Sequence, residues 1–129
     1  MPDYSLVFSG FAVNDIDRAR DFYRDVLGLS VADESMGQLS IQLPAGGFVL
    51  VYPKSDHVPA TYTMLNLEVT DIDVAVDELV GRGVVMLQYE GFGQDARGIA
   101  RGIAAHEGPD IAWFCDPAGN ILSVLHNAV

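Results

Sequence analysis

The stretch Val13-Asn14-Asp15-Ile16-Asp17-Arg18-Ala19-Arg20-Asp21 occurs a second time, as Val69-Thr70-Asp71-Ile72-Asp73-Val74-Ala75-Val76-Asp77, at an offset of 56 residues (71 minus 15). In both copies an alternating apolar segment leads into an Asp-Ile-Asp sequence typical of a helix start. A repeat of this length, with strands before and after one helix, indicates two copies of one supersecondary unit that bury their apolar faces together. The repeat predicts two half-sheets that enclose a cleft, where a ligand would bind.

The first copy predicts a β-α-β-β-β module over about residues 5–55. Its helix is expected over residues 16–27, with Asp15 as the N-cap and Gly28 at the C-terminal cap. Strands are expected near residues 6–13, 30–33, 39–43 and 48–52.

The second copy predicts the same module over about residues 62–126. Asp71 caps a helix over residues 72–80, which Gly81 and Gly83 end. Its strands are expected near residues 62–69, 84–89, 111–115 and 121–125. The fold class is therefore α+β, with two tandem modules that form a curved mixed sheet around a cleft in a single domain of residues 1–129.

Composition and charge narrow the class of protein. With 129 residues, half of them hydrophobic, the chain can bury a core without disulfides. The start of the chain has no signal-peptide pattern and no segment has the ~20 apolar residues of a membrane span, so we expect a cytoplasmic protein. A net charge of −11 with seven Lys and Arg argues against nucleic acid as a partner. The one cysteine, Cys115, has apolar neighbours and is expected to be a buried, unreactive side chain.

Side chains alternate across a strand, so the segment at residues 64–69 predicts which residues face the cleft. Leu65, Leu67 and Val69 are apolar and should cover the helix. The residues then expected on the concave face are Met64, Asn66 and Glu68 and, by the repeat offset, Phe8, Gly10 and Ala12.

The sequence Asp116-Pro117-Ala118-Gly119-Asn120 predicts a tight hairpin turn. If Cys115 pairs with Ile121 across this turn, Trp113 lies opposite Ser123. A bulge in the turn would shift that register by one residue.

The two helix starts and this turn together resemble the vicinal oxygen chelate superfamily, which includes glyoxalase I, extradiol dioxygenases, fosfomycin-modifying enzymes and the bleomycin-resistance binding proteins. The likeness covers roughly residues 6–126, and its longest motif is Asp15-Ile16-Asp17-Arg18-Ala19-Arg20-Asp21-Phe22-Tyr23-Arg24-Asp25-Val26-Leu27-Gly28-Leu29. The resemblance implies paired β-α-β-β-β modules and a homodimer.

Metal-dependent members of that superfamily carry His, Gln or Glu at positions that correspond here to Phe8, Met64, Ser123 and about Val49. A divalent cation needs about three or four N or O ligands, which phenyl, alkyl and thioether groups do not supply. We therefore expect no metal and no cofactor.

The interpretation that these observations favour is a metal-independent binding protein that sequesters an aromatic or amphipathic molecule, as the bleomycin-resistance binders do. Aromatic and apolar walls suit flat guests. The expected ligand-binding residues are Phe8, Met64 and Trp113 as walls, Asn66, Glu68 and Ser123 as polar contacts, and Tyr52, Tyr89 and Phe92 at the rim.

Two other functions stay open. The first is a lyase, isomerase or oxygenase, either with displaced metal ligands such as Glu68, His106 and Glu107 or without metal and with Glu68 as the base. The second is a module that binds a partner protein. The Gly-rich segment over residues 91–110, which holds Arg97 and Arg101, is a candidate for a mobile flap over the cleft.

Overall fold

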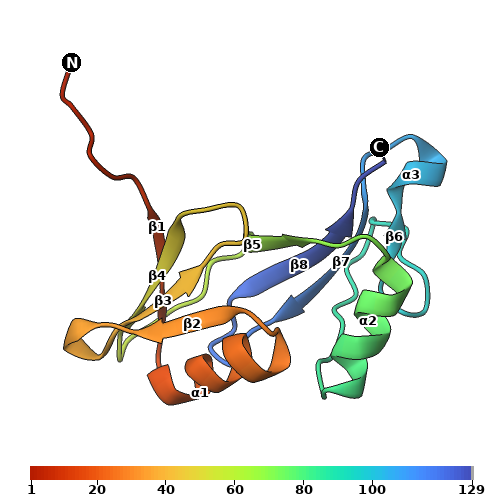
Figure 1. Cartoon of the computed structure of the whole chain (residues 1–129). Coiled ribbons are helices and arrows are strands. Elements are labelled where there is room, and N and C mark those ends of the chain that lie inside the picture. The colour runs from red at the N-terminus through yellow and green to blue at the C-terminus, as the bar shows by residue number, and fades with distance from the viewer. Residues whose placement is uncertain (129) are drawn as a thin grey trace. The chain divides into compact units, whose positions relative to one another are not determined.

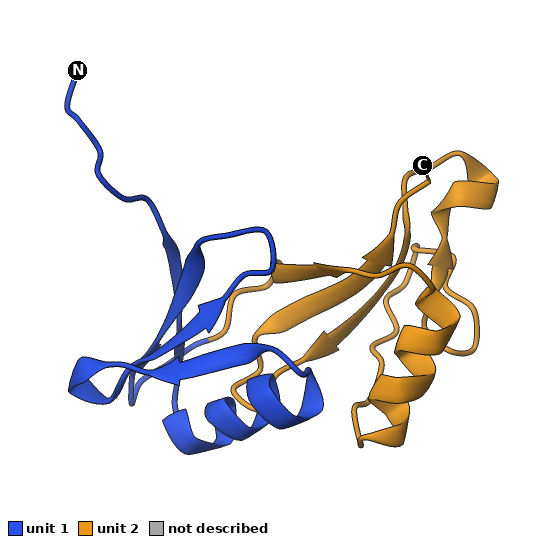
Figure 2. Cartoon of the chain, viewed as in Figure 1, with its two compact units in different colours: residues 1–58 blue, residues 59–129 orange. Residues whose placement is uncertain are grey.

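The computed structural model of the chain describes residues 1–128 and consists of two compact units, Met1–Val58 and Pro59–Val129 (Figure 2). Each unit has its own four-stranded mixed sheet with a helix after its first strand (Figure 1). The fold class is therefore α+β, with tandem β-α-β-β-β modules as the repeat predicts. The cleft and the single domain stay predictions.

Unit 1 has the strand order β1-β4-β3-β2, with β1 parallel to β4 and the other pairs antiparallel. Its elements are β1 (Ser9–Val13), α1 (Ile16–Asp21), the π-helical η1 (Phe22–Val26), β2 (Ser30–Asp33), the 3₁₀ turn η2 (Ser35–Gly37), β3 (Leu39–Gln42) and β4 (Phe48–Pro53).

Unit 2 repeats this topology with the order β5-β8-β7-β6, in which β5 is parallel to β8. Its elements are β5 (Thr63–Glu68), α2 (Ile72–Gly81), β6 (Ala100–Arg101), α3 (Gly102–Ala105), β7 (Asp110–Cys115) and β8 (Ile121–His126). Within residues 1–128, none of the helices has the length and apolar character that crossing a bilayer requires.

The two repeated helix starts are N-capped as the sequence predicts. The Asp15 side chain accepts a hydrogen bond from the Arg18 amide at 3.1 Å, and Asp71 accepts one from the Val74 amide at the same distance. These caps satisfy amide groups that the first helical turn leaves unpaired.

The sequence predicts a regular helix as far as Leu27, but the structure differs. It changes after Asp21 into the π-helical turn η1, in which the Leu27 amide donates to the Phe22 carbonyl. The wider turn carries Tyr23, which is fully buried, with its ring centroid 5.6 Å from that of Phe11. Gly28 then ends the helix with a φ of +71°, as its predicted capping role requires.

Each core lies between a sheet and its helix. Leu39, Ile41 and Val51 are fully buried in unit 1, and Ala112, Phe114 and Leu122 in unit 2. Alternate residues of the same strands, such as Tyr52 and Trp113, face the other side of each sheet.

The predicted strand over residues 84–89 is absent. The edge of β7 pairs instead with the two-residue strand β6, and Leu87 adds one hydrogen bond from its amide to the Trp113 carbonyl at 2.8 Å. The side chain of Gln94 takes the place of a neighbouring strand. It accepts from the Tyr89 amide at 2.6 Å and donates to the carbonyls of Leu87 and Gly98 at 2.8 and 2.7 Å.

Candidate ligand-binding site

The face of the unit 2 sheet opposite α2 carries a polar pair beside Trp113. Trp113 lies opposite Ser123 in the β7–β8 register, and Cys115 lies opposite Ile121, which confirms the predicted hairpin pairing. The Ser123 hydroxyl is fully buried and donates to the Asn66 side-chain oxygen at 2.6 Å. Asn66, which is exposed, thus lies on the predicted face.

A register shift in β5 changes which side chain meets Trp113. Thr63 pairs with Ile121 and Leu65 with Leu122, so Met64 is an extra residue in the strand. The indole N–H of Trp113 donates to the Thr63 hydroxyl at 3.1 Å. Thr63 was not predicted as a site residue, because no residue in the segment marks a bulge. Met64 is half-buried.

Three aromatic residues predicted for the site, from separate parts of unit 2, come together on this face. The ring centroids of Tyr89 and Trp113 are 5.6 Å apart, those of Phe92 and Trp113 are 5.2 Å apart, and those of Tyr89 and Phe92 are 5.7 Å apart. Their interplanar angles of 58° to 83° are edge-on or tilted geometries that aromatic pairs prefer.

The three rings line a hollow of about 430 Å³, which we call the aromatic hollow. Its volume lies in the usual range of ligand pockets, about 300–1,000 Å³. None of its lining residues carries a charge, and four of them were not predicted from the sequence. The lining consists of Thr61, Tyr62, Thr63, Tyr89, Phe92, Trp113 and Ile121.

Two other predicted aromatic residues belong to unit 1. Phe8 is 49% exposed and stacks on Phe48, with ring centroids 4.7 Å apart and an interplanar angle of 23°. Tyr52 lies on the sheet face opposite α1, where its ring is 4.0 Å from the position a Cβ would take at Gly10. Gly10 therefore faces away from the helix, as the repeat offset predicts.

The same face of unit 1 carries a hydrogen-bonded polar row that the sequence analysis missed. Gln42 donates to the Ser40 hydroxyl at 3.1 Å, and Ser40 donates to the Glu34 carboxylate at 2.8 Å. The alternation Leu39-Ser40-Ile41-Gln42 is the signal that could have identified the row.

The residues at the family's metal positions do not fit a divalent cation. Val49 faces the core, opposite Ile41 in the β3–β4 register, and its neighbours Phe48 and Leu50 have no donor atom to offer. The ring of Phe8 stacks on Phe48, and the Ser123 hydroxyl is bonded to Asn66. Neither phenyl nor alkyl groups replace the missing ligands.

The other candidate catalytic or metal-binding side chains are either exposed to solvent or, in the case of the Cys115 thiol, protonated. Glu68, His106 and Glu107 are all exposed, and within residues 1–128 no three His, Cys, Asp or Glu side chains form a group that could hold a metal. Burial, with the nearby Asp116 carboxylate, raises the pKa of the half-buried Cys115 thiol, so the thiol stays protonated.

The segment at residues 91–110 is bound to α2 by ion pairs. Arg97 donates to the Asp73 carboxylate at 2.7 Å and also to the Asp77 carboxylate, while Arg101 donates to Asp73 at 2.7 Å. Of this segment only Phe92 lines the aromatic hollow. The two arginines thus attach the segment to the helix, and a mobile flap over the cleft stays a prediction.

Residues 6–124 match the family model of the Glyoxalase/Bleomycin resistance protein/Dioxygenase superfamily, and the chain belongs to this family. The match spans both units and includes each of the motifs that carry the resemblance. No match is found among curated proteins.

Solved structures of the same fold include proteins with different roles. An antibiotic-binding protein from Streptomyces, TnmS3, is 21% identical, with 98% of this chain and 100% of that chain covered and a TM-score of 0.66. A fosfomycin resistance protein from Listeria monocytogenes, FosX, is 14% identical, with 99% and 97% covered and a TM-score of 0.69. A superfamily member from Sphaerobacter thermophilus is 23% identical, with 95% and 98% covered and a TM-score of 0.65. At these identities the likeness shows the fold.

Proposed function

We propose that this protein binds and sequesters an aromatic or amphipathic small molecule without a metal. The single observation that carries the proposal is the aromatic hollow, where Tyr89, Phe92 and Trp113 converge on about 430 Å³ of space with an uncharged lining. Such a site holds its ligand by surface contact, because it has no charged group or metal ligand to direct a reaction.

The lining favours planar, apolar guests. Burial of apolar surface contributes about 25 cal/mol per Å², and an aromatic pair adds about 0.5–1.5 kcal/mol beyond that area. Because Thr63 already accepts the Trp113 indole N–H, the ring is held in place and its polar edge is satisfied. Thr61 and Tyr62 supply hydroxyl groups that can orient a polar substituent of the guest.

The remaining predicted contacts complete the proposal. Asn66 and Ser123 lie on the same face as Trp113, and Met64 and Glu68 belong to the same strand as Asn66. Phe8 and Tyr52, in unit 1, stay predicted ligand contacts, and in the proposal the protein acts in the cytoplasm as a homodimer with two equivalent sites. The roles of TnmS3 and FosX, antibiotic binding and fosfomycin resistance, support a protective binding role.

A thermal-shift screen against planar aromatic natural products and cationic antibiotics tests this function, since a ligand that binds only the folded state raises the melting temperature. We expect hits that stabilise the protein in the presence of EDTA. Phe92→Ala should reduce their shifts, because Phe92 lines the hollow and is 56% exposed, so its loss leaves the core intact. Val74→Ala, at a 51% exposed position outside the hollow, is the matched control. Equal shifts in the two variants would contradict the assignment of the site.

A further inference from the structure

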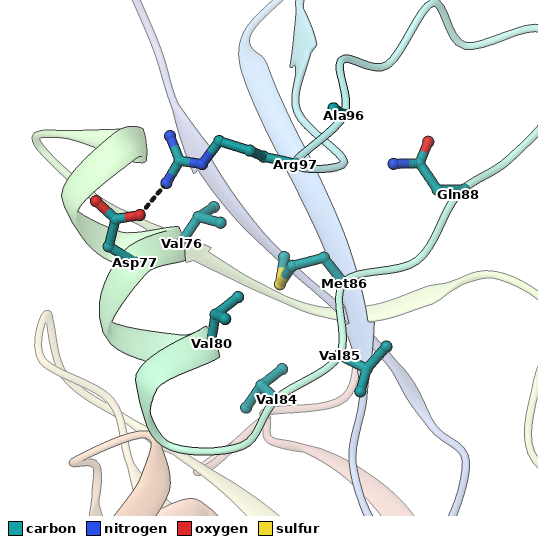
Figure 3. A pocket seen from close by; sticks show the side chains of 9 residues that line it. All are labelled: Val76, Asp77, Val80, Val84, Val85, Met86, Gln88, Ala96 and Arg97. Carbon is teal, nitrogen blue, oxygen red and sulfur yellow. Dashed lines mark hydrogen bonds and ion pairs between the residues drawn. The ribbon is translucent and has the colours of Figure 1, made fainter.

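A second hollow in unit 2 shares no lining residue with the aromatic hollow. It has a volume of about 500 Å³ and lies between α2, the residues that follow this helix, and the loop that carries Arg97 (Figure 3). We call it the valine pocket. Its lining consists of Val76, Asp77, Val80, Val84, Val85, Met86, Gln88, Ala96 and Arg97.

The walls of the valine pocket are mainly aliphatic. Val76 is buried, whereas Val80, one helical turn later, is 53% exposed, so the apolar stripe of α2 continues out of the core into the pocket. Across the space, the Met86 side chain points towards these two valines (Figure 3). Methyl and thioether groups favour an apolar occupant, because its burial removes apolar surface of both molecules from water.

The polar rim favours an uncharged occupant. The Arg97 guanidinium makes three hydrogen bonds, to the Asp73 carboxylate, the Asp73 carbonyl and the Asp77 carboxylate. An anion would meet those two carboxylates and a chain with a net charge of −11, and a cation would meet the guanidinium. A guanidinium has five N–H donors, so Arg97 retains donors for one neutral oxygen acceptor.

The size of the pocket favours a small molecule over a protein. A stable protein interface uses about 20–30 residues from each side. The valine pocket is lined by nine residues, all between positions 76 and 97. Its volume is instead typical of small-molecule sites, which occupy about 300–1,000 Å³.

We propose that the valine pocket is a second binding site, for a compact uncharged aliphatic molecule that carries one carbonyl or hydroxyl oxygen. The hydrocarbon part lies against Val76, Val80 and Met86, and the oxygen accepts a hydrogen bond from Arg97. This site is independent of the aromatic hollow and of the function proposed for it.

Camphor is a suitable probe, because it is compact, branched and neutral and has one carbonyl oxygen. Titration of the protein with camphor, followed through the valine and methionine methyl signals and the aromatic ring signals in NMR spectra, should give saturable shifts of Val76, Val80 and Met86. Val80→Gln places an amide in the pocket and should weaken binding at least about fivefold, since it removes apolar contact. Val74→Gln is the matched control, because Val74 lies on the same helix, is equally exposed at 51%, and does not line the pocket.

A second variant tests the site from its opposite wall. Ala96→Phe puts a ring at an exposed lining position and should also weaken camphor binding by filling the space. Shifts confined to Trp113, Tyr89 and Phe92 would overturn the proposal, as would the absence of saturable shifts up to the solubility limit of camphor. Equal affinity in Val80→Gln and Val74→Gln would overturn it too.

Discussion

At the scale of single residues, the side chains that fix Trp113 explain why this site differs from a metal centre. The indole N–H is bonded to Thr63, and Ser123, opposite Trp113 on β8, is buried and bonded to Asn66. The hydroxyl groups of Thr63 and Ser123 are thus both hydrogen-bonded to neighbouring side chains. The surface left open is the aromatic ring itself.

The residue types that cap helices could be predicted from the sequence, but the partner of Trp113 could not. Asp15 and Asp71 act as caps through a local pattern that spans three residues. Thr63 meets Trp113 because one extra residue, Met64, shifts the strand register, and only the packing of strands from distant parts of the chain determines such a bulge.

Asp73 provides a prediction at the same scale. Hydrogen bonding from Arg101, with further attraction from Arg97, holds the pKa of the Asp73 carboxyl below its ordinary value. The unfolded chain therefore takes up a proton at this residue before the folded chain does, so the stabilisation is complete above about pH 4. It is lost as the pH falls through the lower, folded-state pKa.

Urea denaturation of the wild type and Asp73→Asn at pH 7 and at pH 3 checks this expectation. The variant should be less stable at pH 7, and the difference between the two proteins should shrink at pH 3. A difference that does not depend on pH would show that the ion pairs to Arg97 and Arg101 contribute no stability through the Asp73 charge.

At the scale of elements, the segment that follows α2 departs most from the sequence prediction. Residues 84–89 are mostly apolar, as in a buried strand, yet their backbone groups bind the amide side chain of Gln94. Asp95 then organises the next turn. Burial raises the pKa of its carboxyl, but bonds from the Ile99 and Arg97 amides outweigh this and lower the pKa. These interactions place Tyr89 and Phe92 at the aromatic hollow.

Gln94 is therefore expected to position the aromatic wall. Gln94→Ala removes three hydrogen bonds and should lower the free energy of unfolding by about 1–3 kcal/mol, because it leaves polar backbone groups without partners. It should also speed hydrogen exchange at the Tyr89 amide, which donates to Gln94. Gln88→Ala, which removes one bond to the Asp95 carbonyl, is the control. Unchanged exchange at Tyr89 in Gln94→Ala would contradict the positioning role.

Most of the other elements could be predicted because their signals are local. The Asp-capped helix starts, the glycine at the end of the first helix and the turn at residues 116–120 all depend on short-range chemistry. In that turn the Asp116 carboxylate accepts from the Ala118 and Asn120 amides at 2.9 Å each. The π-helical turn η1 could not be predicted, because the burial of Tyr23 against Phe11 is a contact between separate elements.

At the scale of the whole molecule, the repeat produces two sheets of equal topology, and their exposed faces carry different chemistry. The face of unit 1 opposite α1 holds the polar row of Gln42, Ser40 and Glu34, whereas the face of unit 2 opposite α2 holds the aromatic hollow. Duplication thus explains the shared architecture, and the side chains on the two faces account for their different chemistry.

The central claim is that the aromatic hollow binds its ligand by contact with rings and without a metal. Isothermal titration calorimetry of the best screening hit, with EDTA-treated protein and with protein supplied with zinc, nickel, manganese or iron, tests this directly. We predict a dissociation constant near micromolar or tighter that is the same with and without metal. Trp113→Ala should weaken it at least about tenfold, as loss of a buried aromatic anchor does. Binding that requires a metal, or that survives Trp113→Ala unchanged in a folded variant, would contradict the account.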